Sequence, residues 1–174
     1  MTKMTIAATI VASAGAAFAG SSHTFDLSGI GVEGGYLDNI GITSLVHDFG
    51  SAGKITNISW DVNYESISPS WNSELAMSID TDSGFFDIIA GDYGAGDNPG
   101  PYAFSGSEDV SIDTADGLVL LTLWETFNDT SVDPDSVFGA GSSLTVTFVP
   151  APGAVALLGM GGLVATRRLG IAGR

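Results

Sequence analysis

The chain has 174 residues, with 24 glycines, no cysteine, and 20 acidic side chains against five lysines and arginines. The lack of cysteine excludes a disulfide scaffold, a thiol nucleophile and a cysteine-ligated zinc site. A net charge of −15 argues against nucleic acid as a partner, because a phosphate backbone needs a basic surface. A mean hydropathy of +0.31 nevertheless indicates a folded chain rather than a disordered one.

The charges divide the chain into three parts. All 20 acidic residues fall between Asp26 and Asp135, and Lys54 is the one cation between residues 21 and 149, which gives this stretch a net charge of −19. The other four cations lie in the two apolar ends. We therefore predict three parts, namely residues 1–19, a folded domain at 20–149 and residues 150–174, and the two apolar ends are the candidates for targeting signals.

The N-terminus has the features of a secretory signal peptide. Lys3 supplies a positive start, residues 6–18 are uncharged and mostly apolar, and Ala17 and Ala19 match the small-x-small pattern that signal peptidase accepts. This pattern predicts an N-terminal signal helix that signal peptidase removes after Ala19. It also predicts export across the inner membrane, to the cell surface or the extracellular matrix.

The C-terminus combines a helix breaker, a short apolar run and a basic stop. Pro150-Ala151-Pro152 precedes the apolar residues 154–165, and Arg167 and Arg168 follow. Twelve helical residues span about 18 Å, whereas a bilayer core needs about 30 Å. The two arginines would stay on the cytoplasmic side. The pattern therefore predicts an apolar helix with a transient inner-membrane association.

Residues 150–168 resemble the PEP-CTERM sorting signal of Gram-negative-type bacteria. That family has a Pro-Glu-Pro motif, a helix rich in Leu, Gly and Ala, and a terminal arginine cluster. The resemblance implies processing by an exosortase-type membrane protease and a link to exopolysaccharide and biofilm matrix. The chain departs from the family at Ala151, which replaces the motif Glu, and in the six residues that follow Arg168.

The body between the ends has the sequence pattern of an all-β domain. Apolar and polar residues alternate with period two in several segments, which indicates half-buried strands, and glycine-rich turns separate them. Strands are predicted at 22–27, 44–49, 58–64, 75–79, 85–90, 101–104, 109–112, 118–124 and 143–148. The fold class is therefore an antiparallel β-sandwich or jelly roll of about eight strands.

Two further features of the body carry expectations about the core. Residues 118–124 are apolar on both faces, which predicts a central strand covered on both sides, and Trp60 and Trp124 are expected on core-facing positions. The stretch from Ile58 to Ile79, with a strand, Ser-Pro-Ser-Trp at 68–71 and then residues 74–79, is similar to the P-domain jelly rolls attached to secreted bacterial proteases. That similarity implies a fold and nothing about activity.

Oxygen-rich turns make calcium the one cofactor that the sequence suggests. Asp80 and Asp82 alternate ahead of a glycine, and Asp92, Asp97 and Asn98 lie in a glycine-rich loop. Calcium takes six to eight oxygen ligands, which such loops can supply. The alternative is that these side chains form turns through bonds to their own backbone.

Trp71, Tyr93 and Tyr102 are expected in or beside loops, where aromatic rings can hold sugars, with exopolysaccharide as the partner. The alternative is that these rings close the end of the sandwich.

Catalytic patterns are sparse. His23 is expected in a flexible start, and His47 in a short strand without a nucleophile motif beside it. Glu125 follows Trp124 at a strand end, where it would either be desolvated or mark the exit of the strand to water. We therefore predict a secreted, non-catalytic structural or adhesive protein of the cell envelope or matrix. A carbohydrate-binding module and a secreted hydrolase with a carboxylate pair are the two alternatives.

Overall fold

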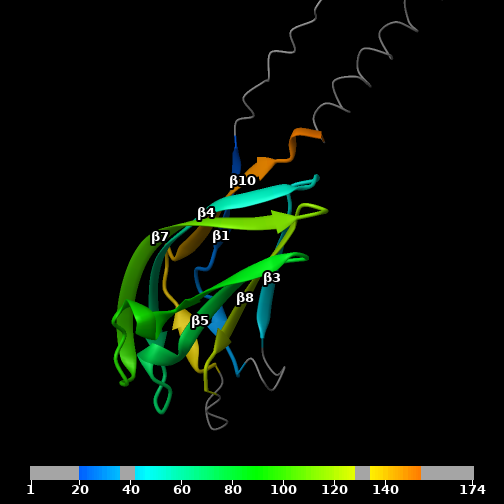
Figure 1. The fold of residues 1–174 in the computed structure, drawn as a ribbon. Helices are drawn as coiled ribbons and strands as arrows, with labels where there is room; N and C mark the ends of the chain where they lie inside the picture. The colour runs from blue at the N-terminus through cyan, green and yellow to red at the C-terminus, as the bar shows by residue number, and fades with distance from the viewer. Residues whose placement is uncertain (1–19, 36–41, 128–133, 154–174) are drawn as a thin grey trace, which may run out of the picture.

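A computed structural model describes residues 20–35, 42–127 and 134–153, and these residues form an all-β domain (Figure 1). It has ten strands and two short 3-10 helices. The strands are β1 (Ser21–Asp26), β2 (Gly31–Val32), β3 (Thr43–Asp48), β4 (Gly53–Ser66), β5 (Leu75–Thr81), β6 (Gly84–Ile89), β7 (Gly100–Thr114), β8 (Leu118–Glu125), β9 (Ser136–Phe138) and β10 (Ser143–Pro150). The helices are η1 (Asn72–Glu74) and η2 (Ala90–Tyr93).

The strands form two antiparallel sheets. Sheet A has the order β1-β10-β4-β9-β2, and β7 pairs with the other edge of β4. Sheet B has the order β3-β8-β5-β6. This arrangement confirms the predicted antiparallel all-β class. The two strands absent from the prediction, β2 and β9, have two and three residues, too few for a period-two pattern to be visible.

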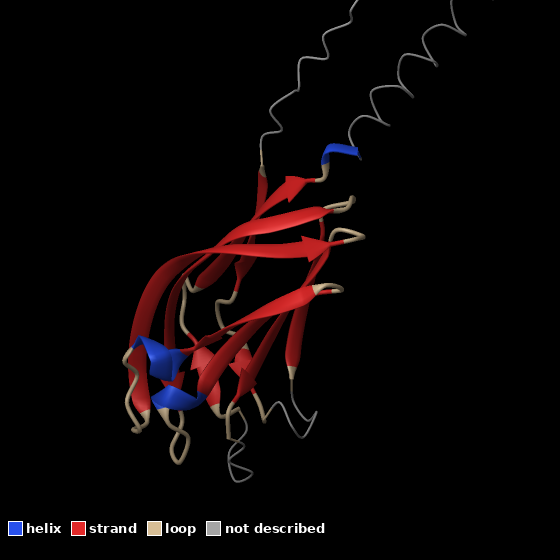
Figure 2. Cartoon of the chain, viewed as in Figure 1, coloured by secondary structure: helices blue, strands red, loops and turns tan. Residues whose placement is uncertain are grey.

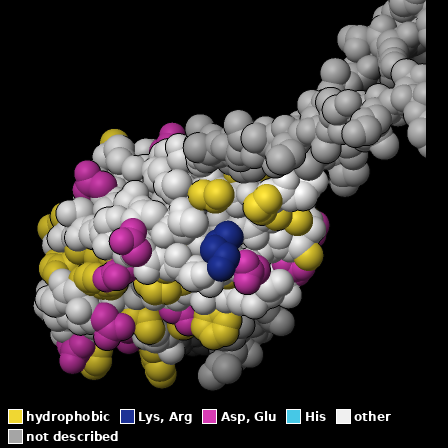
Figure 3. All heavy atoms as spheres, turned by 45° about the horizontal axis from the view of Figure 1, so that its top comes forward, with side chains coloured by type: hydrophobic (Ala, Val, Ile, Leu, Met, Phe, Trp, Pro, Cys, Tyr) yellow, Lys and Arg dark blue, Asp and Glu magenta, His cyan; other side chains and the backbone are white. Residues whose placement is uncertain are grey.

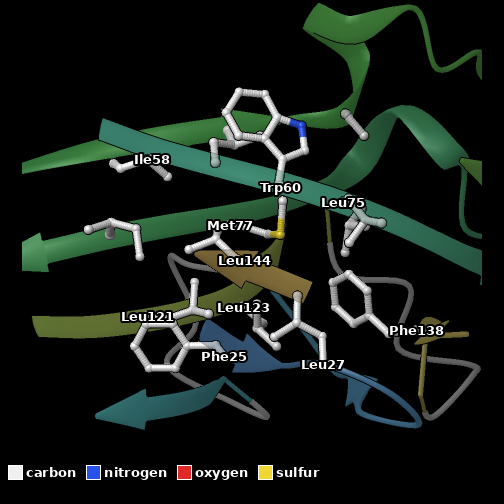
Figure 4. Packing of buried hydrophobic residues seen from close by; sticks show 14 of the residues in the cluster. Phe25, Leu27, Ile58, Trp60, Leu75, Met77, Leu121, Leu123, Phe138 and Leu144 are labelled. Atoms are coloured by element: carbon white, nitrogen blue, oxygen red, sulfur yellow. The ribbon is translucent and has the colours of Figure 1, made fainter. Parts of the chain in front are cut away.

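The hydrophobic core lies between the two sheets, and its residues run in sequence from Phe25 to Val146. Figure 4 shows side chains of sheet A, such as Trp60 and Leu144, close to Met77 and Leu121 of sheet B. Every member of this cluster falls inside the predicted body, because the alternating strands each direct one face inward. The described residues therefore contain a complete two-sheet core.

Strand β8 differs from the prediction. Its core face is formed by Val119, Leu121 and Leu123, but its other face is only partly covered, since Leu118 is 44% exposed and Trp124 is half-buried, although Thr122 is buried. The predictions that residues 118–124 are covered on both sides and that Trp124 faces the core are therefore wrong. The outer face of β8 forms part of the outer surface of sheet B. Trp60, by contrast, is buried as predicted.

Strand β7 replaces two predicted strands, at 101–104 and 109–112, with one continuous strand of 15 residues. Gly106 lies within it, directly opposite Trp60 of β4. A Cβ atom added to Gly106 would lie 2.5 Å from Trp60 Cζ2. Glycine at this position therefore accommodates the indole ring and does not end a strand.

Both ends of the described chain lie at one end of the sandwich (Figure 1). Ser21 at the start of β1 pairs with Phe148 of β10, and Pro150 at the end of β10 pairs with Gly53 at the start of β4. The 14 residues of β4 run from there to the opposite end, a length of about 43 Å. Helices η1 and η2 lie at that opposite, distal end (Figure 2).

Candidate functional site

The distal end carries an open aromatic groove, which we call the distal groove. Its volume is about 340 Å³, and Pro69, Trp71, Glu74 and Phe127 line it. Trp71 is 45% exposed and Phe127 is 61% exposed. Two exposed aromatic side chains in one groove form an apolar patch, and such patches mark sites that contact a ligand or a partner. Of the three aromatic residues predicted to bind sugar, Trp71 lines the distal groove, and Tyr93 and Tyr102 do not.

Hydrogen bonds through Glu74 hold the two sides of the distal groove together. The backbone N–H of Trp71 donates to the Glu74 carboxylate at 2.8 Å, and the Glu74 N–H donates to the Trp71 carbonyl at 3.1 Å. The Glu74 carbonyl accepts from the N–H of Thr126 at 2.8 Å, which places Phe127, the next residue, beside η1. The exposed rings therefore stand on an ordered backbone.

Tyr93 and Tyr102 pack against the core instead of lining the distal groove. The Tyr93 ring lies edge-on to Trp60, with 5.1 Å between ring centroids, and stacks on Phe104 at 5.6 Å. The Tyr102 hydroxyl donates to the Tyr93 carbonyl at 2.9 Å. This arrangement matches the alternative in which loop aromatics close the end of the sandwich.

A second opening lies on the outer face of sheet B, and we call it the sheet B cleft. Its volume is about 230 Å³, and Ser78, Asp80, Phe85, Asp87 and Trp124 line it. The cross-strand pairs explain this set, since Ser78 lies between Asp87 of β6 and Thr122 of β8, and Asp80 lies beside Phe85. Period-two alternation turns all five side chains to the same face.

The electrostatics of the sheet B cleft are those of two neighbouring carboxylates. Burial raises the pKa of the Asp80 carboxyl and the negative charge of Asp87 raises it further, while hydrogen bonds with Ser78 and Thr122 oppose the rise. The Ser78 hydroxyl, which is buried, also donates to the Asp87 carboxylate at 2.6 Å. The cleft therefore concentrates negative charge between two aromatic walls.

The residues predicted to bind calcium make separate contacts. Asp80 faces the sheet B cleft, whereas the Asp82 carboxylate accepts from the N–H of Ala115 at 3.0 Å. The Asp97 carboxylate accepts from the Ser73 hydroxyl at 2.7 Å, and Asn98 donates to the Pro99 carbonyl at 3.3 Å.

Asp92 lies in η2 and is exposed. Within the described part of the chain, no group of three or more His, Asp or Glu side chains is arranged to hold a metal ion. Calcium binding stays a prediction.

His23 and His47, far apart in sequence, stack on each other. Their ring centroids are 3.6 Å apart and their planes differ by 7°. His23 lies on β1 at the edge of sheet A, and His47 on β3 at the edge of sheet B, so the stack joins the two sheets. The prediction of a flexible start for His23 is wrong, because β1 pairs with β10 along its whole length. Sequence alone carries no signal for this contact.

Two carboxyl groups are buried at the distal end of the core. Glu125 and Asp135 are almost completely buried, and the Ser136 hydroxyl donates to the Glu125 carboxyl. Asp135 accepts from the N–H of Gly34 at 3.5 Å. Glu125 therefore does not mark the exit of β8 to water. Neither residue lines the distal groove or the sheet B cleft.

Part of the predicted sorting signal belongs to the described fold. Pro150 pairs with Gly53, and the N–H of Ala151 donates to the Ala52 carbonyl at 2.9 Å, while Pro152 is exposed. The remaining predicted processing residues, Ala17, Ala19, Arg167 and Arg168, lie outside the described residues, as do the two predicted terminal helices. In residues 20–35, 42–127 and 134–153, no helix has the length and apolar character needed to cross a membrane.

Comparisons with known proteins do not assign the chain to a family. No protein-family model matches the sequence, and no curated protein matches it. Among solved structures, the chain is similar to dimeric latent PorU from Porphyromonas gingivalis, with 10% sequence identity and a TM-score of 0.39. The similarity covers 75% of this chain and 13% of the PorU chain, and we infer neither fold nor function from it.

Proposed function

We propose that the protein is a secreted, non-catalytic structural or adhesive component of the bacterial cell envelope or exopolysaccharide matrix, sorted by an exosortase-type system. The observation that carries this proposal is that the chain ends and the distal groove lie at opposite ends of the domain. Both chain ends leave at one end, beside the start of β4, and the distal groove lies at the other. A domain held in this way presents exposed Trp71 and Phe127 away from its attachment.

The charge of the surface supports an extracellular role. Lys54 is the one Lys or Arg of the described residues, and it forms an ion pair with Asp113 at 3.4 Å. On the face shown in Figure 3, the acidic side chains are spread over separate positions. Spread negative charge keeps a protein soluble and prevents its copies from associating, which suits a protein delivered to a crowded matrix.

We also propose that the two-sheet fold is a jelly roll. The eight longer strands support this class, because their order is β1-β10-β4-β7 in one sheet and β3-β8-β5-β6 in the other. Every pair among these strands is antiparallel. The first and last strands are neighbours in sheet A, and successive long strands alternate between the sheets except at the β5–β6 hairpin, as expected for two wrapped Greek keys.

A carbohydrate-binding module is the second candidate function. The exposed rings of Trp71 and Phe127 beside the Glu74 carboxylate favour it, since aromatic faces stack on sugar rings and a carboxylate accepts hydroxyl protons. This candidate is compatible with the first, because an adhesive protein of a polysaccharide matrix needs such a surface.

The test separates delivery from adhesion. The full chain, expressed in a bacterium with an exosortase-type protease, should be found in the envelope or matrix fraction, and mass spectrometry should show a C-terminus that ends before Arg167. Replacing both Arg167 and Arg168 by Ala should leave it unprocessed. An intact C-terminus at Arg174 in the mature protein would contradict the sorting proposal.

Adhesion is tested with a variant of the distal end. The double substitution Trp71→Ala and Phe127→Ala should lower the retention of the protein on isolated matrix. Val46→Ala removes a similarly exposed apolar side chain, 64% exposed on β3, and serves as the matched control. Equal retention of both variants and the unaltered protein would contradict a contact through the distal groove.

A further inference from the structure

The sheet B cleft combines exposed aromatic rings with carboxylates, and one class of ligand can bind to both. Phe85, which is 67% exposed, stands at one side and Trp124 at the other, with Asp80 and Asp87 between them. From the strand register, Phe85 and Trp124 are two strands and four residues apart, which puts their Cα atoms about 16 Å from each other. The aromatic side chains are therefore spaced to flank an extended ligand.

The rings favour a ligand with flat apolar faces and polar edges, and pyranose sugars have both. The floor of the cleft supplies the polar contacts, because the carboxylates of Asp80 and Asp87 accept hydrogen bonds and the hydroxyl of Ser78 lies on the strand position opposite Asp87. These groups stand on paired strands, so they need no ordering when a ligand arrives. A cavity of about 230 Å³ is smaller than a drug-sized site, which suits a narrow chain lying across the sheet.

The negative charge of the sheet B cleft then determines which class of sugar can bind. No Lys or Arg lines the cleft, and the described body carries one lysine in all, so an anionic polysaccharide would be repelled. Two adjacent carboxylates favour a cation between them, and the Trp124 ring can also attract an ammonium group over its face. We propose that the sheet B cleft binds a polysaccharide whose pyranose units carry a protonated amine, that is, glucosamine units.

This inference rests on the proposed extracellular function and names a ligand class for it. It concerns a surface other than the distal groove, so the two are tested by different variants. Failure of sugar binding would leave envelope localisation and adhesion through Trp71 untouched. Failure of localisation would leave binding in the sheet B cleft measurable on the purified protein.

The experiment is isothermal titration of the secreted protein with three oligomers at about 0.15 M salt, where long-range attraction is screened. The oligomers are a β-1,4 glucosamine hexamer, the N-acetylglucosamine hexamer with the same skeleton but no charge, and hexalysine. We expect the glucosamine hexamer to bind at least about tenfold more tightly than either of the others. Equal binding of the N-acetylated hexamer or of hexalysine would overturn the proposal, as would no binding of the glucosamine hexamer.

Matched variants locate the site. Phe85→Ala and Asp87→Asn should each weaken binding of the glucosamine hexamer about tenfold. The amide oxygen introduced by Asp87→Asn can still accept from the Ser78 hydroxyl, so the fold is preserved. Val46→Ala on the same sheet face, and Asp61→Asn, which removes one exposed charge from sheet A, should leave binding unchanged. If Asp61→Asn weakens binding as much as Asp87→Asn, general charge attraction explains it and the proposed site is refuted.

Discussion

Gly106 gives the sharpest prediction about how the two long strands fit together. In Gly106→Ala the new methyl group would lie 2.5, 2.9 and 3.1 Å from three atoms of the Trp60 indole. Trp60 is 3% exposed and contacts Tyr93, so the ring has no free space into which to move. Such overpacking costs about 1–3 kcal/mol. Removing a glycine from a strand returns about 0.5–1 kcal/mol, which leaves a net loss of about 1 kcal/mol when the middle of each range is taken.

The assay is urea unfolding followed by far-UV circular dichroism, with the free energy of unfolding taken by linear extrapolation. The matched control is Gly84→Ala in β6, where the nearest atom to the new methyl is Ile112 Cγ2 at 3.3 Å, and we expect a smaller change. In a Trp60→Phe background the clashing atoms are absent, so Gly106→Ala should become neutral or stabilising. The reasoning is refuted if Gly106→Ala is as stable as the unaltered protein, or if its effect is the same in both backgrounds.

Three further predictions concern charge. The pKa of His23 is lowered by burial and by the charge of His47, so the folded state binds fewer protons than the unfolded chain, and the free energy of unfolding should fall as pH falls below about 6.5. His23→Phe should make the free energy of unfolding depend less on pH between about pH 7.5 and 5.5, as measured in denaturant titrations. An unchanged pH dependence would exclude the stack of His23 on His47 as its source. Glu125→Ala should lower the free energy of unfolding by about 2–4 kcal/mol in thermal melts, because it leaves a cavity and deprives the Ser136 hydroxyl of this acceptor. Glu125→Gln should lower the free energy of unfolding by less. Equal losses of stability in the two variants would show that the acceptor is unimportant. Raising NaCl from about 0.02 to 0.5 M should raise the melting temperature by screening the self-repulsion of the −19 body. Calcium chloride at matched ionic strength should add to that rise only if a specific calcium site exists.

Much of the fold was predictable because alternation identifies a buried face without further information. In β4, Trp60, Val62 and Tyr64 are buried and the residues between them are exposed, as the pattern indicates. The same alternation in β8 places Glu125 on the face of Leu121 and Leu123, inside the core. The chemical character of glutamate favoured the opposite interpretation, and here the strand register prevailed over the side chain's preference for water.

The distal groove and the sheet B cleft were less predictable, because each depends on contacts between distant segments. Trp71 could be identified as a loop aromatic, but its neighbour Phe127 arrives through the hydrogen bond from Thr126 to η1. Trp124 was expected in the core, since an apolar run does not reveal which of its two apolar faces is covered. Its position across the cleft from Phe85, two strands away, follows from the pairing of β5 with both β6 and β8, which no local pattern shows.

The junction between the domain and the proposed sorting segment has a consequence for the proposed processing. Pro150 and the N–H of Ala151 are still bonded to the start of β4, and the Phe148 ring occupies the space beside Gly53, where an added Cβ would lie 2.2 Å from it. A protease that needs extended, unpaired backbone must therefore open the end of β10 to cut before Ala151, whereas a cut beyond exposed Pro152 leaves every strand pair intact. Because the last buried apolar side chain of the described residues is that of Phe148, either cut would leave all of these buried side chains in the domain. The fold thus favours cleavage on the C-terminal side of the proline motif, where processing and folding do not compete.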